Sequence, residues 1–114
     1  MARTDQPVDL NHLDRYTGGD RAINEEILRL FEDQCSQILG KLEALGQSEA
    51  DAKSWREMTH TLKGAARGIG AFDLGDAVAA AETAGPGAVE ALSRLKREAA
   101  AVRDFIAEFL KTPP

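Results

Sequence analysis

The sequence lacks the features that staple small proteins together or attach them to a membrane. Its single cysteine, Cys35, permits neither an internal disulfide nor a cysteine-based zinc site, and a lone thiol suits a reducing compartment. No apolar run is long enough to cross a bilayer, and the first residues lack the apolar core of a secretory signal. We therefore expect a cytoplasmic protein without a membrane segment.

Aromatic residues and positive charge are also scarce. Aromatic residues make up 5% of the chain, which disfavours β-sheets because strands are enriched in them. The 14 Lys and Arg residues face 19 Asp and Glu residues, and the formal net charge of −5 argues against nucleic-acid binding. Ala and Leu, which favour helices, dominate the apolar residues instead. With 114 residues, we expect residues 1–114 to form a single domain.

Glycine-containing turns separate five segments in which apolar residues recur every three or four positions, the period of a helix. Asp9 and Asp20 precede the first two segments as N-terminal caps. Short connections between long amphipathic helices favour antiparallel neighbours. The sequence therefore predicts an all-α fold, an up-and-down antiparallel four-helix bundle with a short extra N-terminal helix. The expected helices start after Asp9, at about residue 20, at about residue 50, at Phe72 and at about residue 88.

The apolar side of these helices predicts the core. Cys35 belongs to this side of the second helix, so we interpret it as a small buried hydrophobic residue and not as a reactive thiol. The apolar positions on the first three helices are Leu10, Leu13 and Tyr16, then Ile23, Ile27, Phe31, Cys35, Ile38, Leu42 and Leu45, then Trp55, Met58, Leu62, Ala65, Ala66 and Ile69.

The opposite side of the third helix carries cations, one histidine and one glycine. A charged side is most often just the solvated face of a helix. Solvated faces usually mix both signs of charge, however, and an exposed helical glycine costs about 1 kcal/mol relative to alanine. Gly68 and Gly70 lie near the helix end and are expected to be C-terminal caps. The residues on this side are Lys53, Arg56, His60, Lys63, Gly64 and Arg67.

An exposed imidazole is a nucleophile near neutral pH when one ring nitrogen is unprotonated. Nearby cations oppose protonation of the ring, and Lys and Arg side chains bind phosphate oxygens well. Lys63 lies one turn after His60 on the same side of the helix. These residues are therefore suited to holding a phosphoryl group, and Gly64 would let a partner's surface approach the ring.

The stretch "HTLKGAARGIG", residues 60–70, resembles the hallmark of the histidine-containing phosphotransfer (HPt) domains. That hallmark reads His-x-Leu-Lys-Gly, two small residues, and a glycine six places after the first glycine. The likeness continues through "GAFDLGDAVAAAE" and backward through "YTGGDRAINEEILRLFEDQ", so it covers essentially the whole chain. The matching hallmark residues are His60, Leu62, Lys63, Gly64, Ala65, Ala66 and Gly70.

The resemblance implies a role for each of these side chains. His60 would accept phosphate on Nε2, Lys63 would neutralise charge on the phosphoryl oxygens, and Gly64 would clear space for a receiver domain. The family often places Gln or Glu on its fourth helix to bond the other ring nitrogen, and by spacing this residue is Glu82. A carboxylate there would hold the Nδ1–H tautomer. The alternative for Glu82 is an ordinary surface position.

Other residues have no fixed family counterpart. We interpret Arg56 and Arg67 as receiver-docking or phosphate-field residues, and we expect Ile69, with apolar residues of the first helix, to contribute to a modest docking interface. His12, the other histidine, is expected to be a surface side chain.

The implied partners are response-regulator receiver domains and an upstream (hybrid) histidine kinase. We expect a monomer that binds no cofactor or metal itself, because no metal-ligand spacing recurs, with Mg²⁺ held by the receiver's carboxylates.

Three other functions compete with phosphotransfer. A kinase is disfavoured because Thr61 follows the histidine, no proline occurs until Pro86, and there is no nucleotide-binding loop. A hydrolase would need an acid–base partner that the sequence does not reveal. A helical adaptor that binds a response regulator or kinase without phosphorylation of His60 stays open.

Overall fold

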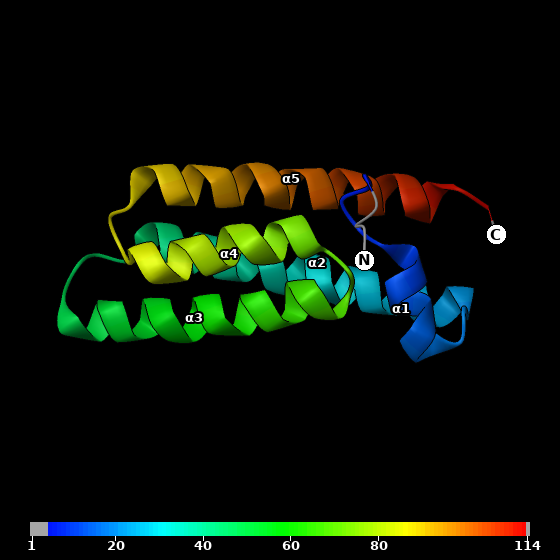
Figure 1. Cartoon of the computed structure of the whole chain (residues 1–114), viewed down its shortest axis with the longest axis horizontal. Coiled ribbons are helices and arrows are strands. Elements are labelled where there is room, and N and C mark those ends of the chain that lie inside the picture. The colour runs from blue at the N-terminus through cyan, green and yellow to red at the C-terminus, as the bar shows by residue number, and fades with distance from the viewer. Residues whose placement is uncertain (1–4, 114) are drawn as a thin grey trace.

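The computed structural model describes residues 5–113, and the part of the chain that it describes forms helices and no strands. Helices α2 to α5 run along the long axis of the molecule in alternating directions, and α1 lies at the end where α2 begins (Figure 1). The predicted all-α bundle with a short extra N-terminal helix is confirmed. The helices are α1 (Leu10–Thr17), α2 (Arg21–Ala44), α3 (Glu49–Gly68), α4 (Phe72–Ala84) and α5 (Val89–Lys111).

Polar side chains cap the first three helices. Asp9, Asp20 and Ser48 precede α1, α2 and α3. The Asp9 side chain accepts two hydrogen bonds from backbone N–H groups in the first turn of its helix, and the other two side chains accept one each. The caps predicted at Asp9 and Asp20 are therefore confirmed. None of the helices in residues 5–113 is long and apolar enough to cross a membrane.

A Schellman turn ends α3 at Gly70, whose φ is +87°. The Ala71 N–H donates to the Ala66 carbonyl at 2.8 Å, which is the long hydrogen bond of that motif. A Cβ on Gly70 would lie 2.6 Å from the backbone oxygen of Asp9, so the glycine also lets the chain before α1 approach. The expectation that Gly68 is a second cap is wrong. Gly68 is the last residue of α3, and Gly70 alone supplies the left-handed residue that completes the turn.

The first turn of α2 also differs from the prediction. Ile23 is 44% exposed, and Asn24 takes the inward position at 5% exposure. Thr17 Oγ1 donates to Asn24 Oδ1 at 2.6 Å, and Asn24 Nδ2 donates to Asp14 Oδ1 at 2.8 Å, so the buried amide is satisfied on both sides. Leu28, which the predicted stripe omits, is fully buried one turn later. A polar network thus joins α1 to α2 where a hydrophobic contact was expected.

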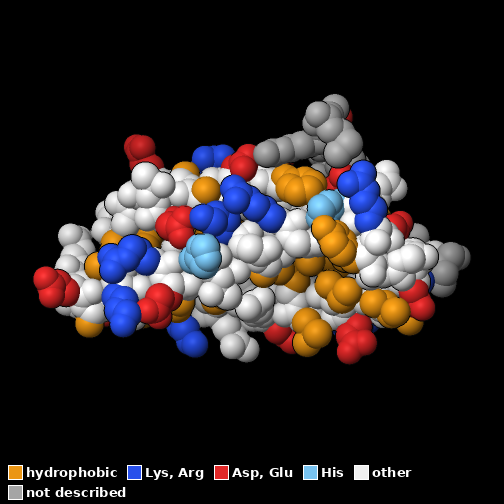
Figure 2. Space-filling model, turned by 60° about the horizontal axis from the view of Figure 1, so that its bottom comes forward, with side chains coloured by type: hydrophobic (Ala, Val, Ile, Leu, Met, Phe, Trp, Pro, Cys, Tyr) orange, Lys and Arg blue, Asp and Glu red, His pale blue; other side chains and the backbone are white. Residues whose placement is uncertain are grey.

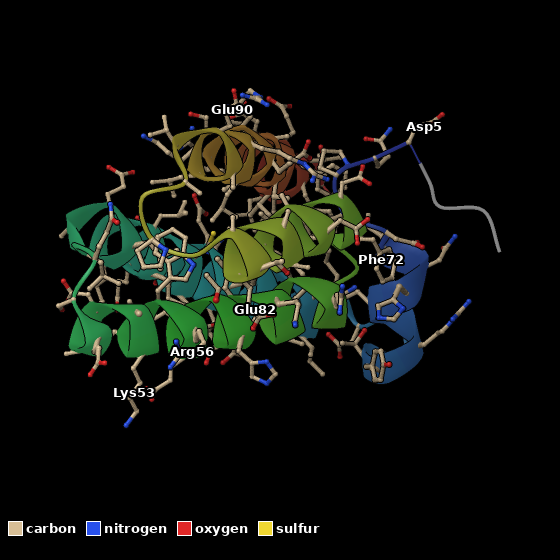
Figure 3. All side chains as sticks on the ribbon, turned by 60° about the vertical axis from the view of Figure 1, so that its left-hand side comes forward. Asp5, Lys53, Arg56, Phe72, Glu82 and Glu90 are labelled. Carbon is tan, nitrogen blue, oxygen red and sulfur yellow. The ribbon has the colours of Figure 1, made fainter. Side chains whose placement is uncertain are left out.

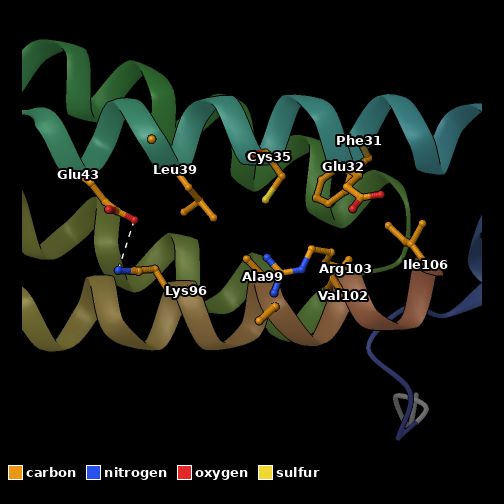
Figure 4. A pocket seen from close by; sticks show the side chains of 13 residues that line it. Phe31, Glu32, Cys35, Leu39, Glu43, Lys96, Ala99, Val102, Arg103 and Ile106 are labelled. Carbon is orange, nitrogen blue, oxygen red and sulfur yellow. Dashed lines mark ion pairs between the residues drawn. The ribbon is translucent and has the colours of Figure 1, made fainter. Parts of the chain in front are cut away.

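Cys35 is buried, as predicted, and its side chain points into a groove between α2 and α5 (Figure 4). Burial and the nearby Glu32 carboxylate raise the pKa of Cys35 to about 11, against an opposing effect of Arg103. The thiol therefore stays protonated at neutral pH and is a poor nucleophile. An ion pair between Lys96 Nζ and Glu43 Oε1, 3.3 Å apart, crosses the groove (Figure 4).

Candidate functional site

His60 projects from α3 on the side away from the core. Its side chain is 77% exposed, whereas the neighbouring Thr59 and Leu62 are fully buried. Within residues 5–113, no group forms a hydrogen bond or ion pair with Nε2. The helix that carries the imidazole is therefore held in the bundle by its buried side, and the ring itself is accessible to another protein.

Glu82 of α4 lies beside both His60 and Lys63. Its Oε1 accepts a hydrogen bond from Lys63 Nζ at 2.6 Å, and its Oε2 is 3.6 Å from His60 Nδ1. The second distance is within the range of an ion pair but too long for a hydrogen bond. Figure 3 shows Glu82 between α4 and α3. In the unphosphorylated protein the Glu82 carboxylate is hydrogen-bonded to Lys63. Its other oxygen lies next to His60 Nδ1, the ring nitrogen that Glu82 was expected to bond.

Lys63 also sets the acidity of this carboxyl group. Its hydrogen bond holds the pKa of Glu82 below the ordinary value of 4.5, partial desolvation opposes the shift, and the charges of Lys63 and His60 reinforce it. Because the side chains of Lys63 and Glu82 are 21% and 25% exposed, the pair lies at the rim of the bundle and solvent weakens it. The carboxylate is thus ionised at neutral pH and available to either neighbour.

A Glu82→Gln variant should lose stability in a pH-dependent way. The folded-state pKa of Glu82 is lowered, so its contribution to stability is present above about pH 4.5 and is lost as the pH falls through the folded-state pKa. At neutral pH we expect the free energy of unfolding of the variant to be about 0.5–1 kcal/mol lower than that of the wild type. Urea unfolding over a pH series measures this difference. Glu26→Gln, at an exposed position of α2, is the control, and a difference that does not shrink in acid would contradict the assignment.

Acidic side chains lie beside most of the cations on the His60 side of α3. Lys53 Nζ lies 3.9 Å from Glu57 Oε1, and Arg67 lies 3.9 Å from Asp76 Oδ1 on α4. With the Lys63–Glu82 pair, acidic groups thus stand next to three of the cations. The sequence of α3 shows only cations, His60 and Gly64 on this side, because two of these acids belong to α4. A Cβ on Gly75 would lie 2.9 Å from Arg67 Cγ, so this glycine lets the arginine cross α4.

Arg56 remains an exposed cation one turn before His60. Figure 3 shows Arg56 and Lys53 extending from α3 away from the bundle. The positive field beside His60 therefore comes mainly from the Arg56 side of the ring, and the Lys63 side is balanced by Glu82.

Two exposed glycines follow His60 on α3. A Cβ built on either Gly64 or Gly68 meets no heavy atom within 4 Å, so neither residue is required by the packing of the bundle. Gly64 lies one turn after His60 and Gly68 two turns after it, on the same side of the helix. The surface beyond the imidazole is therefore flat. Gly68 was assigned from the sequence to a helix cap and not to this surface, although its spacing of four from Gly64 was a visible signal.

Ile69 is not available for docking. Its side chain is 5% exposed and belongs to the hydrophobic core, so the predicted docking role is wrong. The position follows the last helical residue of α3, where the chain turns inward toward α4.

Exposed apolar residues lie elsewhere on the molecule. Tyr16, an expected core residue, is 74% exposed, and Ile23 and Leu30 of α2 are 44% and 62% exposed. Figure 2 shows hydrophobic side chains gathered over the α1 end of the face that carries α3. His12, expected to be a surface side chain, is half-buried, and its ring makes edge contacts with the rings of Tyr16 and Phe72.

Among residues 5–113, no group of three or more His, Cys, Asp or Glu side chains could hold a metal ion.

Comparison with curated proteins and with solved structures found no match. A family model described as the Hpt domain matches residues 26–105, which include His60, Lys63 and Glu82. Domains of this family are phosphocarriers of two-component signalling and not kinases. The chain therefore belongs to the Hpt domain family.

Proposed function

We propose that this chain relays a phosphoryl group between aspartates of receiver domains through a phosphohistidine at His60. The observation that carries the proposal is the 77% exposed imidazole with Nε2 unengaged and with Lys63 and Glu82 on its other side. A nucleophile, a phosphate-binding cation and a group for the second ring nitrogen thus converge on one patch.

The transfer step follows from this geometry. The Nε2 lone pair of the neutral ring attacks the phosphorus of a phospho-aspartate, the N–P bond forms, and the bond to the aspartate oxygen breaks so that its carboxylate leaves. The proton stays on Nδ1, and the ring becomes cationic. Glu82 Oε2, 3.6 Å away, needs only a small movement to accept a hydrogen bond from Nδ1–H. The same step run toward a second receiver returns the ring to its neutral form.

Lys63 would change partners during this step. In the resting protein it is bound to Glu82, so its charge is partly neutralised. A phosphoryl group on Nε2 brings three acceptor oxygens to the exposed side of the ring, and an ammonium group binds them well. Movement of Lys63 to the phosphoryl group would release Glu82 toward the cationic ring, so each new charge gains a partner of opposite sign.

The docking surface that we propose surrounds His60. Gly64 and Gly68 provide a flat approach, and Arg56 and Arg67 supply positive charge toward the acidic pocket of a receiver, where Mg²⁺ would be held. On α2, Glu32, Leu39 and Glu43 line the groove against α5, and helical periodicity places Ile23 and Leu30 on the opposite flank, toward α3. Figure 2 shows the apolar gathering on this side. An apolar area beside a charged one is typical of a transient interface.

Leu30→Ser should weaken receiver binding and leave the fold intact. Leu30 is 62% exposed on α2, so its loss costs little stability, whereas a buried interface residue typically contributes about 1–2 kcal/mol to binding. We expect the dissociation constant for a cognate receiver to rise about five- to thirtyfold, measured by calorimetry. Val89→Ser is the matched control, because Val89 is 75% exposed at the start of α5. Equal affinity of Leu30→Ser and wild type would place the interface elsewhere.

Incubation with a phosphorylated receiver tests the function itself. Labelled phosphate should move from the receiver to this chain and form an acid-labile, base-stable adduct, and it should pass on to a second receiver. A binding-only adaptor would form a complex with the receiver and take no label.

A further inference from the structure

Trp55 is the only tryptophan of the chain and lies in the core at 2% exposure, five residues before His60. Its Nε1–H donates a hydrogen bond to the backbone carbonyl of Ala81 at 2.8 Å. The same carbonyl oxygen accepts the N–H of Gly85 at 3.0 Å, which closes the last turn of α4. The indole thus ties α3 to the end of α4 through a buried polar contact.

This contact lies directly behind Glu82. Ala81 is fully buried, and Glu82 follows it in the last turn of α4, which contains no basic residue and ends at Ala84. The Ala81 carbonyl has two lone pairs, so it accepts the indole N–H in addition to the Gly85 N–H, and the second bond adds to the stability of this turn. Without the indole N–H, the turn that presents Glu82 would depend on the Gly85 bond and on apolar packing alone.

The backbone of Trp55 is also bonded to the residue that precedes His60. The Thr59 hydroxyl donates to the Trp55 carbonyl at 2.7 Å, and Thr59 is fully buried next to His60. Two hydrogen bonds, one to the Trp55 backbone and one from its indole, therefore connect the residue before His60 to Ala81, the residue before Glu82. The next residue after Thr59 is His60 and the next residue after Ala81 is Glu82, so both residues adjoin a side chain of the proposed phosphate site.

We propose that Trp55 is a positioning residue, which acts through Ala81 to set the place of Glu82 relative to His60 and Lys63. The proposal rests on the phosphotransfer function proposed above and adds a residue remote from the phosphate. The distance between Glu82 Oε2 and His60 Nδ1 is 3.6 Å, so a small displacement decides whether the two can bond. A loosened last turn would leave phosphorylated His60 without its carboxylate partner and shorten the life of the phosphohistidine.

The single tryptophan allows a replacement that changes only the donor. Benzothienylalanine, supplied in place of tryptophan, keeps the shape of the indole and has sulfur where the N–H stands, so only Trp55 is altered. A Trp55→Phe variant serves as a second form without the donor. Ile106→Val is the control, because it removes one buried methylene-sized group from α5 at the other end of the bundle and perturbs stability without touching Glu82.

Two measurements are compared across these proteins. The first is the titration of the Glu82 carboxyl carbon by NMR in the unphosphorylated protein, where the Lys63 bond lowers its pKa. The second is the half-life of phosphohistidine after labelling. Loss of the indole N–H should move the pKa of Glu82 back toward 4.5 and shorten the half-life about two- to tenfold, the range for one lost hydrogen bond. Ile106→Val should change neither.

An unchanged Glu82 titration in both forms without the donor would overturn the positioning role, because it would show that Glu82 keeps its place without the indole. The titration needs no phosphate. If the wild-type protein accepts no label from any receiver, the phosphotransfer proposal fails, and the titration still decides whether Trp55 positions Glu82.

Discussion

His60→Gln should fold like the wild type and accept no phosphoryl group. The side chain is 77% exposed, and substitutions at exposed positions usually change the free energy of unfolding by no more than about 0.5 kcal/mol. Glutamine has similar length and polarity but no nucleophilic ring nitrogen. Label transferred from a phosphorylated receiver should therefore fall to background, whereas the circular dichroism spectrum and the urea midpoint should match the wild type.

His12→Gln is the matched control for this loss. His12 is the only other histidine, and its ring contacts Tyr16 and Phe72, whereas Glu82 lies beside His60 and Lys63. We expect it to accept label at the wild-type level. If His60→Gln retained labelling, or if His12→Gln abolished it, the nucleophile would have been assigned to the wrong residue.

Gly64→Lys should make the protein more stable and slower at phosphotransfer. Gly64 lies in the interior of α3, and a Cβ there meets nothing within 4 Å, so lysine fits without a clash and removes the helix penalty of glycine. We expect a gain of about 0.5–1 kcal/mol in the free energy of unfolding. The long side chain would stand one turn from His60, where a receiver must approach, so we expect the transfer rate to fall at least about tenfold.

Gly40→Lys separates the effect on docking from the effect on the helix. Gly40 is also an exposed glycine in a helix, with nothing within 4 Å of a built Cβ, but it lies on α2 beside the groove against α5. It should raise stability by a similar amount and leave the transfer rate unchanged. Single-turnover transfer from a phosphorylated receiver, with urea unfolding in parallel, compares the two variants. Wild-type transfer by Gly64→Lys would mean that the glycine does not serve access.

Helix positions were readable from the sequence because local signals agree with the fold. Asp9 and Asp20 both cap the helices that they precede, and α4 begins at Phe72 as predicted. The periodicity failed where a polar group is buried. Asn24 takes the inward position of α2 through bonds to Asp14 and Thr17, and no pattern of apolar residues encodes such a network.

The site was predictable to the extent that it lies on one helix. His60, Lys63 and Gly64 share one side of α3, so their spacing was sufficient to bring them together. The state of Lys63 was not predictable, because its partner Glu82 comes from α4 and the approach depends on how the two helices pack. The Trp55 contact was hidden for the same reason, since its acceptor is a backbone carbonyl that any residue could supply.

Ile69 shows a third kind of failure. An apolar residue close to the histidine in sequence was expected to join the docking surface, but the Schellman turn directs it into the core. The exposed large apolar residues lie on α1, where the sequence analysis also expected a contribution, on α2, and at Val89 of α5. Proximity along the chain did not identify the surface, because a helix turns its successive side chains to different faces.

The central claim is that phosphate is carried on Nε2 of His60. The protein, labelled with ¹⁵N in its two histidines and phosphorylated by a receiver, can be examined by NMR for coupling between phosphorus and ring nitrogen. The account predicts that phosphorus couples to Nε2 of His60, with the proton on Nδ1 toward Glu82. Coupling to Nδ1, coupling to His12, or phosphate on a residue other than histidine would contradict it.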